Sequence, residues 1–160
     1  ITGYQKLVKD GMDKLPEFMG DFLIASNMAG FAFGTAGCAA VHAMSYPLGG
    51  TYHVPHGESN YALFTGVLNK YMEKKQDGEI AHLNAYLAEL LHCDVKNVYA
   101  ELENLLNNIL PKKPLHEYGV TKEDITAFTD NVIATQGRLT ANNFVPLSRD
   151  DMIDIYSKLY

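Results

Sequence analysis

Three of the six histidines of this chain lie close together, at His42, His53 and His56. The residues before His42 are small and apolar, whereas the stretch 47–50 contains one proline and two glycines, which disfavour a helix. Pro55 suits the first turn of a new helix. The pattern predicts a helix with His42 late in it, a tight break, and a second helix starting at His56. Two imidazoles facing one point across such a break are suitable ligands for a single metal ion.

This stretch resembles the signature of the iron-containing (group III) alcohol dehydrogenases. The segment Val41–Gly50 (VHAMSYPLGG), followed by Pro55-His56-Gly57, is similar to two motifs of that family. The resemblance implies that His42 and His56 bind a catalytic divalent metal, with iron(II) expected and zinc as the alternative. The family often has a further histidine four positions after the first ligand, and this chain has Tyr46 there. The small-residue segment 29–38 and the final segment 147–156 are also family-like.

The resemblance implies a fold and a domain organisation. The chain is similar to the helical C-terminal half of a two-domain enzyme, and residues 1–160 are expected to form a single helical metal-binding domain, a fragment of a longer protein. The family takes two further metal ligands, an Asp and a His, from a preceding helix, and nothing in residues 1–33 matches that helix. The nucleotide-binding α/β domain is also absent from this chain, so NAD would be bound mainly by that missing N-terminal domain.

The implied activity is NAD-dependent alcohol oxidation. Within the family, residues 38–64 are most similar to bacterial 4-hydroxybutyrate dehydrogenases, which implies interconversion of 4-hydroxybutyrate and succinate semialdehyde. The fragment alone is expected to be inactive, and the full-length enzyme is expected to be a homo-oligomer whose N-terminal domain partners this one. The alternative is a non-enzymatic helical interaction or regulatory module that retains a degenerate metal site.

Three residues beside the predicted ligands have two interpretations each. Tyr46 lies one helical turn after His42, on the same face, and is either a substrate contact or a packed aromatic side chain. His53 is either a substrate contact or a solvated loop histidine. Glu58 is either a hydrogen-bond acceptor for a metal ligand or, as we favour, a first-turn glutamate that interacts with the helix dipole.

The remaining periodicity predicts an all-α fold. Apolar residues recur at helical spacing in every long segment, and no convincing strand alternation occurs. The helix opened by Pro16 is apolar on most sides and is expected to be central. Thr121-x-x-Asp124 predicts a capped helix start, Asp94 is expected to cap another helix, and Ser148 to begin the last.

Composition limits the remaining functional classes. The net charge is −6 with scattered charges, which argues against nucleic acid or an anionic membrane as the main partner. The longest apolar run, 28–44, is too short to span a bilayer. Cys38 and Cys93 do not form a Cys-x-x-Cys pair, and a reduced cytoplasmic location is expected. The first residue, Ile1, suggests a fragment or a processed product.

Overall fold

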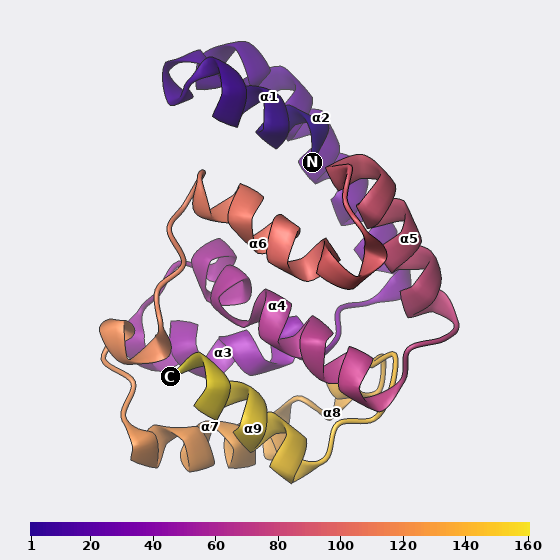
Figure 1. Cartoon of the computed structure of the whole chain (residues 1–160). Helices are drawn as coiled ribbons and strands as arrows, with labels where there is room; N and C mark the ends of the chain where they lie inside the picture. The colour runs from indigo at the N-terminus through magenta and orange to yellow at the C-terminus, as the bar shows by residue number, and fades with distance from the viewer. The chain divides into compact units, whose positions relative to one another are not determined.

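The computed structural model describes all residues, 1–160, and contains only helices (Figure 1). The all-α prediction is confirmed. The α-helices are α1 (Thr2–Asp10), α2 (Leu15–Ala36), α3 (Ala40–Tyr52), α4 (His56–Lys74), α5 (Glu79–Leu91), α6 (Val98–Asn107), α7 (Lys122–Thr135), α8 (Gly137–Thr140) and α9 (Arg149–Leu159). Short 3₁₀ helices span Met12–Lys14, Val95–Asn97 and Leu115–Tyr118. The chain divides into two compact units, residues 1–37 with 81–111 and residues 38–80 with 112–160.

The unit formed by residues 38–80 and 112–160, called the histidine unit below, has its own apolar core. Helix α3 packs against α4 and α7, and α9 packs against α4 and α7. Their apolar positions recur every three or four residues, which places one face of each helix inward. Fully buried side chains of this core include those of Met44, Leu48, Leu63, Val67, Val132, Ile155 and Tyr156.

Two capping boxes set the starts of α7 and α9. The Thr121 hydroxyl accepts from the backbone N–H of Asp124, whose carboxylate accepts from the backbone N–H of Thr121. Ser148 and Asp151 repeat this arrangement at α9. Both starts were predicted, because the hydroxyl and the carboxylate are three positions apart in each case. Asp94 precedes a 3₁₀ helix and makes no side-chain cap, so that prediction is wrong.

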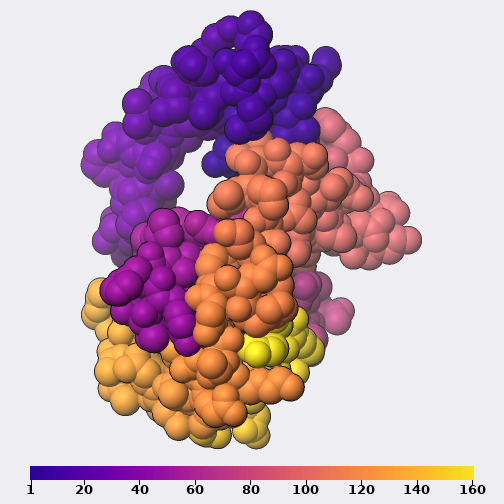
Figure 2. All heavy atoms as spheres, turned by 90° about the vertical axis from the view of Figure 1, so that its left-hand side faces the viewer, coloured from indigo at the N-terminus to yellow at the C-terminus, as the bar shows by residue number.

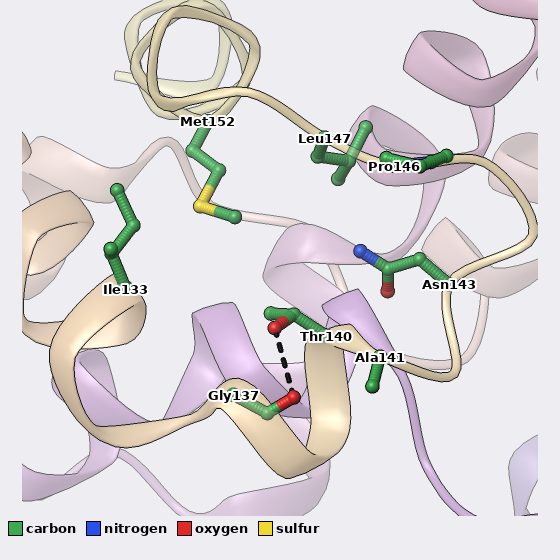
Figure 3. A pocket seen from close by; sticks show the side chains of 8 residues that line it. All are labelled: Ile133, Gly137, Thr140, Ala141, Asn143, Pro146, Leu147 and Met152. Atoms are coloured by element: carbon green, nitrogen blue, oxygen red, sulfur yellow. Dashed lines mark hydrogen bonds between the residues drawn. The ribbon is translucent and has the colours of Figure 1, made fainter.

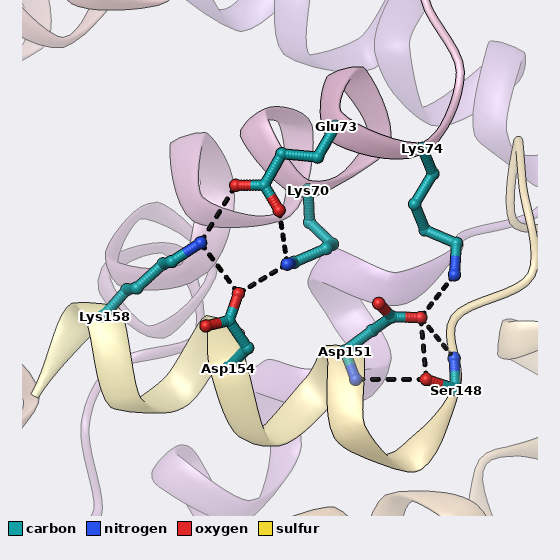
Figure 4. Close-up of polar contacts among 7 residues, drawn as sticks. All are labelled: Lys70, Glu73, Lys74, Ser148, Asp151, Asp154 and Lys158. Atoms are coloured by element: carbon teal, nitrogen blue, oxygen red, sulfur yellow. Dashed lines mark hydrogen bonds and ion pairs between the residues drawn. The ribbon is translucent and has the colours of Figure 1, made fainter.

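Ion pairs join α4 to α9 (Figure 4). Lys70 pairs with both Glu73 and Asp154, and Lys158 lies 2.9 Å from Glu73 and 2.8 Å from Asp154. The carboxylate of Asp154, and to a lesser degree that of Glu73, raises the pKa of Lys70, although burial acts in the opposite direction. This mixed-charge network adds polar contacts to the apolar packing of the two helices.

The break between the histidines lies elsewhere than predicted. Helix α3 continues through Pro47 and both glycines to Tyr52, and His42 is its third residue, near its start rather than its end. The chain turns instead at residues 53–55. The preceding helix ends before Gly37, whose φ of 80° favours glycine. Pro47 stays helical because it is buried in the core, so packing outweighs the hydrogen bond that proline cannot donate.

The unit formed by residues 1–37 and 81–111, called the N-terminal unit below, is built differently. Helix α1 packs on α2 through Tyr4 and Phe22, whose ring centroids are 5.1 Å apart. No residue of α2 is buried, and Phe31 is 75% exposed. The prediction that this helix is central is therefore wrong for this chain, and its atoms lie open in Figure 2. The apolar sequence is present, but apart from the contact with α1 most of the helix is exposed in this structure.

No single helix is long and apolar enough to cross a membrane, whereas the helix pair Met12–Ala36 and Ala40–Tyr52 has the length and composition to do so only when its two parts are taken together.

Candidate metal centre

Packing of α3 against α4 brings His42 and His56 together. Their ring centroids are 5.3 Å apart and the ring planes are inclined by 50°. A metal about 2.1 Å from one nitrogen of each ring would lie roughly 3.2 Å from each ring centre, which at a tetrahedral angle separates the centres by about 5.3 Å. The observed spacing therefore fits two imidazoles on one ion. The sequence predicted that the two rings lie close together and that His56 begins its helix, whereas the position of His42 within its helix differs from the prediction.

The electrostatics favour the neutral form of one histidine. Burial, and then the neighbouring His56, lower the pKa of His42. Both effects disfavour the imidazolium, since burial removes solvent and a second positive charge nearby is repulsive. Only a neutral imidazole has a lone pair for a metal, so this environment keeps His42 ready to bind one near neutral pH.

A series of hydrogen bonds links the two histidines through Asn60 and Ser45, and it was not predicted from the sequence. The Asn60 amide nitrogen donates to Nε2 of His56 at 3.0 Å, and the Asn60 carbonyl oxygen accepts from the Ser45 hydroxyl at 2.7 Å. Ser45 also lies 3.0 Å from the backbone carbonyl oxygen of His42. A spacing of three residues from His42 to Ser45 and four from His56 to Asn60 was the available signal, because such residues share a helix face.

Tyr46 lies beside the pair, as predicted from its spacing. Its ring is stacked on that of His56 with centroids 6.2 Å apart, and the side chain is 41% exposed. It also lines a cavity of about 380 Å³ together with residues of α3 and α7, namely Pro47, Gly50, Thr51, Asp124, Ala127, Phe128 and Asn131. Tyr46 therefore separates the histidines from an open cavity within the same unit.

His53 and Glu58 are not joined to the predicted ligands. His53 is exposed at the end of α3 with φ 56°, and no hydrogen bond or ring contact links it to Tyr46 or to the other two histidines. Glu58 accepts from the Tyr118 hydroxyl at 3.0 Å and lies 3.9 Å from Nζ of Lys113. His56 accepts a hydrogen bond at Nε2 from Asn60, and this bond does not involve Glu58.

Two tyrosines hold the helix that carries His42. The Tyr52 hydroxyl donates to Asp124 of α7 at 2.6 Å, and this hydrogen bond is the main cause of the raised pKa of Tyr52. The Tyr156 hydroxyl of α9 donates to the backbone carbonyl oxygen of Met44 at 2.6 Å. Burial raises the pKa of Tyr156 far above its ordinary range. Both bonds restrain α3 close to the histidine pair.

The sequence matches one protein family along its whole length. The family model described as the C-terminal part of the Fe-containing alcohol dehydrogenase family matches residues 1–160. The chain belongs to this family. Its fold agrees, because an alcohol dehydrogenase from an archaeal halo-thermophile of a Red Sea brine pool superposes with a TM-score of 0.69. That comparison covers 76% of this chain and 32% of the other, at 24% identity.

Curated relatives in the Fe-containing alcohol dehydrogenase family are longer than this chain. The 4-hydroxybutyrate dehydrogenase of Clostridium kluyveri is 49% identical over all of this chain, which spans 43% of the relative. The long-chain-alcohol dehydrogenase 1 of Geobacillus thermodenitrificans is 31% identical over 98% of this chain and 40% of the relative. This chain therefore spans about two fifths of the length of these relatives.

The histidine pair is incomplete as a metal site within this chain. No group of three or more His, Cys, Asp or Glu side chains is arranged to hold a metal ion. A Lewis-acid site needs three protein ligands and an open position. Two imidazoles fit part of such a site.

A second cavity lies among α7, α8, α9 and the loop before α9 (Figure 3). Its volume is about 420 Å³, and its lining is mainly apolar, with Ile133, Leu147 and Met152 facing one another. Asn143 accepts from the Tyr71 hydroxyl at 3.0 Å, whereas its buried amide nitrogen has no partner. None of the residues predicted to bind metal or substrate lines this cavity.

Proposed function

We propose that this chain is the metal-binding helical part of an NAD-dependent alcohol dehydrogenase that interconverts 4-hydroxybutyrate and succinate semialdehyde. The observation that carries the proposal is the juxtaposition of His42 and His56 at a spacing that fits one metal ion. Family membership and the 49% identity to a 4-hydroxybutyrate dehydrogenase support the choice of reaction and substrate. We assign the metal as iron(II), with zinc as the alternative, since imidazole suits both.

The bound metal would supply Lewis-acid polarisation of the substrate oxygen, which favours loss of the hydroxyl proton near neutral pH. Within this chain, His42 and His56 would hold the ion. Asn60 contacts the ring of His56, and Ser45 contacts both Asn60 and the backbone carbonyl oxygen of His42. The hydride acceptor, NAD, would be bound mainly by the N-terminal domain.

The substrate carboxylate needs hydrogen-bond donors once it is removed from water. Tyr46 is our first candidate, because it stacks on His56, is partly exposed and borders a cavity. His53 remains a second candidate that is exposed at the end of the same helix. To contact His53, the substrate would have to extend beyond Tyr46, because no hydrogen bond or ring contact links His53 to Tyr46, His42 or His56.

The proposal extends to the whole polypeptide. Residues 1–160 would act as a single helical metal-binding domain, with the N-terminal nucleotide-binding domain as its partner in the same chain. The uncovered apolar residues of α2 support a missing partner surface, because large exposed apolar patches usually mark interaction sites. We also propose a homo-oligomeric enzyme in the cytoplasm that takes a small alcohol or aldehyde and has neither nucleic acid nor a membrane as partner.

The test uses the longer protein that contains this chain. Oxidation of 4-hydroxybutyrate with NAD and the content of bound metal are measured for the parent protein and for His42→Ala, His56→Ala and His82→Ala. We expect both ligand substitutions to abolish turnover and lower the metal content, whereas His82→Ala, at an exposed histidine of the other unit, changes neither. Unchanged metal content in both ligand variants would refute the assignment.

The chain alone is expected to show no dehydrogenase activity, because the nucleotide-binding domain and the remaining metal ligands are outside it. If the longer protein also fails to turn over 4-hydroxybutyrate and related alcohols while folding normally, the alternative of a non-enzymatic helical module is favoured.

A further inference from the structure

Asn60 contacts a ring nitrogen of His56 that could bind a metal. Its amide nitrogen donates to Nε2 of His56 at 3.0 Å, so Nε2 offers its lone pair to an N–H proton. A neutral imidazole has one N–H and one lone pair, and the hydrogen bond at one nitrogen determines where the proton lies. This hydrogen bond favours the tautomer of His56 that has its proton on Nδ1 and its lone pair on Nε2.

Ser45 determines which end of the Asn60 amide faces the histidine. The Ser45 hydroxyl is 2.7 Å from the Asn60 carbonyl oxygen, and Ser45 is only 1% exposed. The same hydroxyl also lies 3.0 Å from the backbone carbonyl oxygen of His42. Donation of its single proton along the shorter contact, to the amide oxygen, directs the amide N–H of Asn60 towards His56. Ser45 belongs to α3 and Asn60 to α4, so this contact also joins the two helices that carry the histidines.

We propose that Asn60 is a positioning residue whose amide N–H takes the place of the metal on His56 in the metal-free protein and competes with the metal for Nε2. The inference rests on the proposed metal site. In this proposal, Ser45 and Asn60 together influence the affinity of the site for its metal ion.

The sign of the effect follows from linkage. The hydrogen bond from Asn60 exists only while Nε2 is free of metal, and an interaction made only in the unliganded state lowers the affinity for the ligand. A hydrogen bond contributes about 0.5–1.5 kcal/mol, which corresponds to roughly a two- to twelvefold change in a dissociation constant. Removing the amide should therefore tighten metal binding by that factor, provided that His56 remains in place.

The experiment titrates the 160-residue chain with Zn²⁺ by calorimetry. The variants are Asn60→Ala, Ser45→Ala and the matched control Asn108→Ala, which removes an amide that donates to the carbonyl oxygen of Asn104 one turn earlier in the helix. We expect Asn60→Ala to lower the dissociation constant about two- to twelvefold. Ser45→Ala should have a smaller effect in the same direction, and Asn108→Ala none. An unchanged or weaker affinity in Asn60→Ala would overturn the proposal.

A second measurement requires no metal and does not depend on the affinity of any variant for Zn²⁺. The ¹⁵N shifts of the His56 ring in the metal-free chain report which nitrogen carries the proton. We expect Nδ1 protonation in the parent chain and in Asn108→Ala, and a shift of the proton towards Nε2 in Asn60→Ala. A tautomer that does not respond to Asn60→Ala contradicts the inference and leaves the proposed function intact. If instead His56→Ala binds Zn²⁺ as tightly as the parent chain, the proposed metal site fails even where the tautomer responds.

Discussion

The two units of this chain use the same kind of helix and differ in what covers them. In the histidine unit, α3, α4, α7 and α9 bury one face each around a common core. In the N-terminal unit, the longest helix, α2, is strongly apolar and buries no residue. An apolar sequence therefore predicts a buried helix only where another segment packs against it. The relatives are more than twice as long as this chain. Four predictions test this contrast, in order of decreasing effect.

Stability should depend on the histidine unit. Tyr156 is 1% exposed, packs edge-on against Phe128 and donates to Met44, so Tyr156→Ala leaves a large cavity and an unpaired carbonyl. We expect a loss of about 3–5 kcal/mol in the free energy of unfolding, measured by urea denaturation. Tyr156→Phe, which keeps the ring, should lose about 1–2 kcal/mol. A loss in Tyr156→Ala below that of Tyr156→Phe would show that this core does not stabilise the chain.

Substrate recognition should also map to the histidine unit. In the longer protein, Tyr46→Phe and His53→Ala are compared for kcat/KM on 4-hydroxybutyrate and on 1-butanol, which lacks the carboxylate. Loss of one charge-assisted hydrogen bond should cost about 1.5–3 kcal/mol, or roughly 10- to 150-fold, on 4-hydroxybutyrate alone. We expect the larger selective loss for Tyr46→Phe. Equal losses on both substrates would mean that the residue supports the packing or the metal and does not bind the carboxylate.

The start of α9 should make the histidine unit sensitive to acid. Burial acts to raise the pKa of Asp151, but hydrogen bonds from Lys74 and Ser148 lower it overall. A lowered carboxylate pKa stabilises the fold above the unfolded value of about 3.9, and this contribution is lost as the pH falls through the folded pKa. We expect Asp151→Ala to lose about 0.5–2 kcal/mol at pH 7 and to show less further loss below about pH 4 than the parent.

The matched control for Asp151→Ala is Asp150→Ala, which removes a carboxylate from the same helical turn outside the capping box. Its unfolding free energy should stay close to that of the parent. Equal losses in both variants would attribute the effect to the helix dipole and not to the hydrogen bonds of Asp151.

The smallest effect is expected on α2. Phe31 is 75% exposed, so Phe31→Ala should change the free energy of unfolding of this chain by no more than about 0.5 kcal/mol. In the longer protein the same substitution should cost clearly more, because we propose that the missing part covers this helix. Equal and negligible effects in both proteins would remove the argument for a covered α2 surface.

Much of the site followed from local pattern. Helical periodicity predicted the all-α fold, and the capping boxes of α7 and α9 were visible three residues apart, since both depend on neighbours along the chain. The motif around His42 and His56 indicated the pair and the family. Local rules failed at Pro47, which lies within α3 although proline disfavours helix interiors. Burial of Pro47 and the hydrogen bond from Tyr156 to Met44 stabilise this helix through distant contacts.

The helical elements and the two histidines proposed as metal ligands could be predicted from the sequence, because these depend on side-chain chemistry and short-range spacing. The tertiary structure was needed to show that His42 lies at the start of its helix, that Ser45 of α3 contacts Asn60 of α4, and that most of α2 is exposed. Each of these depends on which surfaces meet. That outcome is decided by packing between segments far apart in the chain, and for α2 by whether a covering surface is present at all.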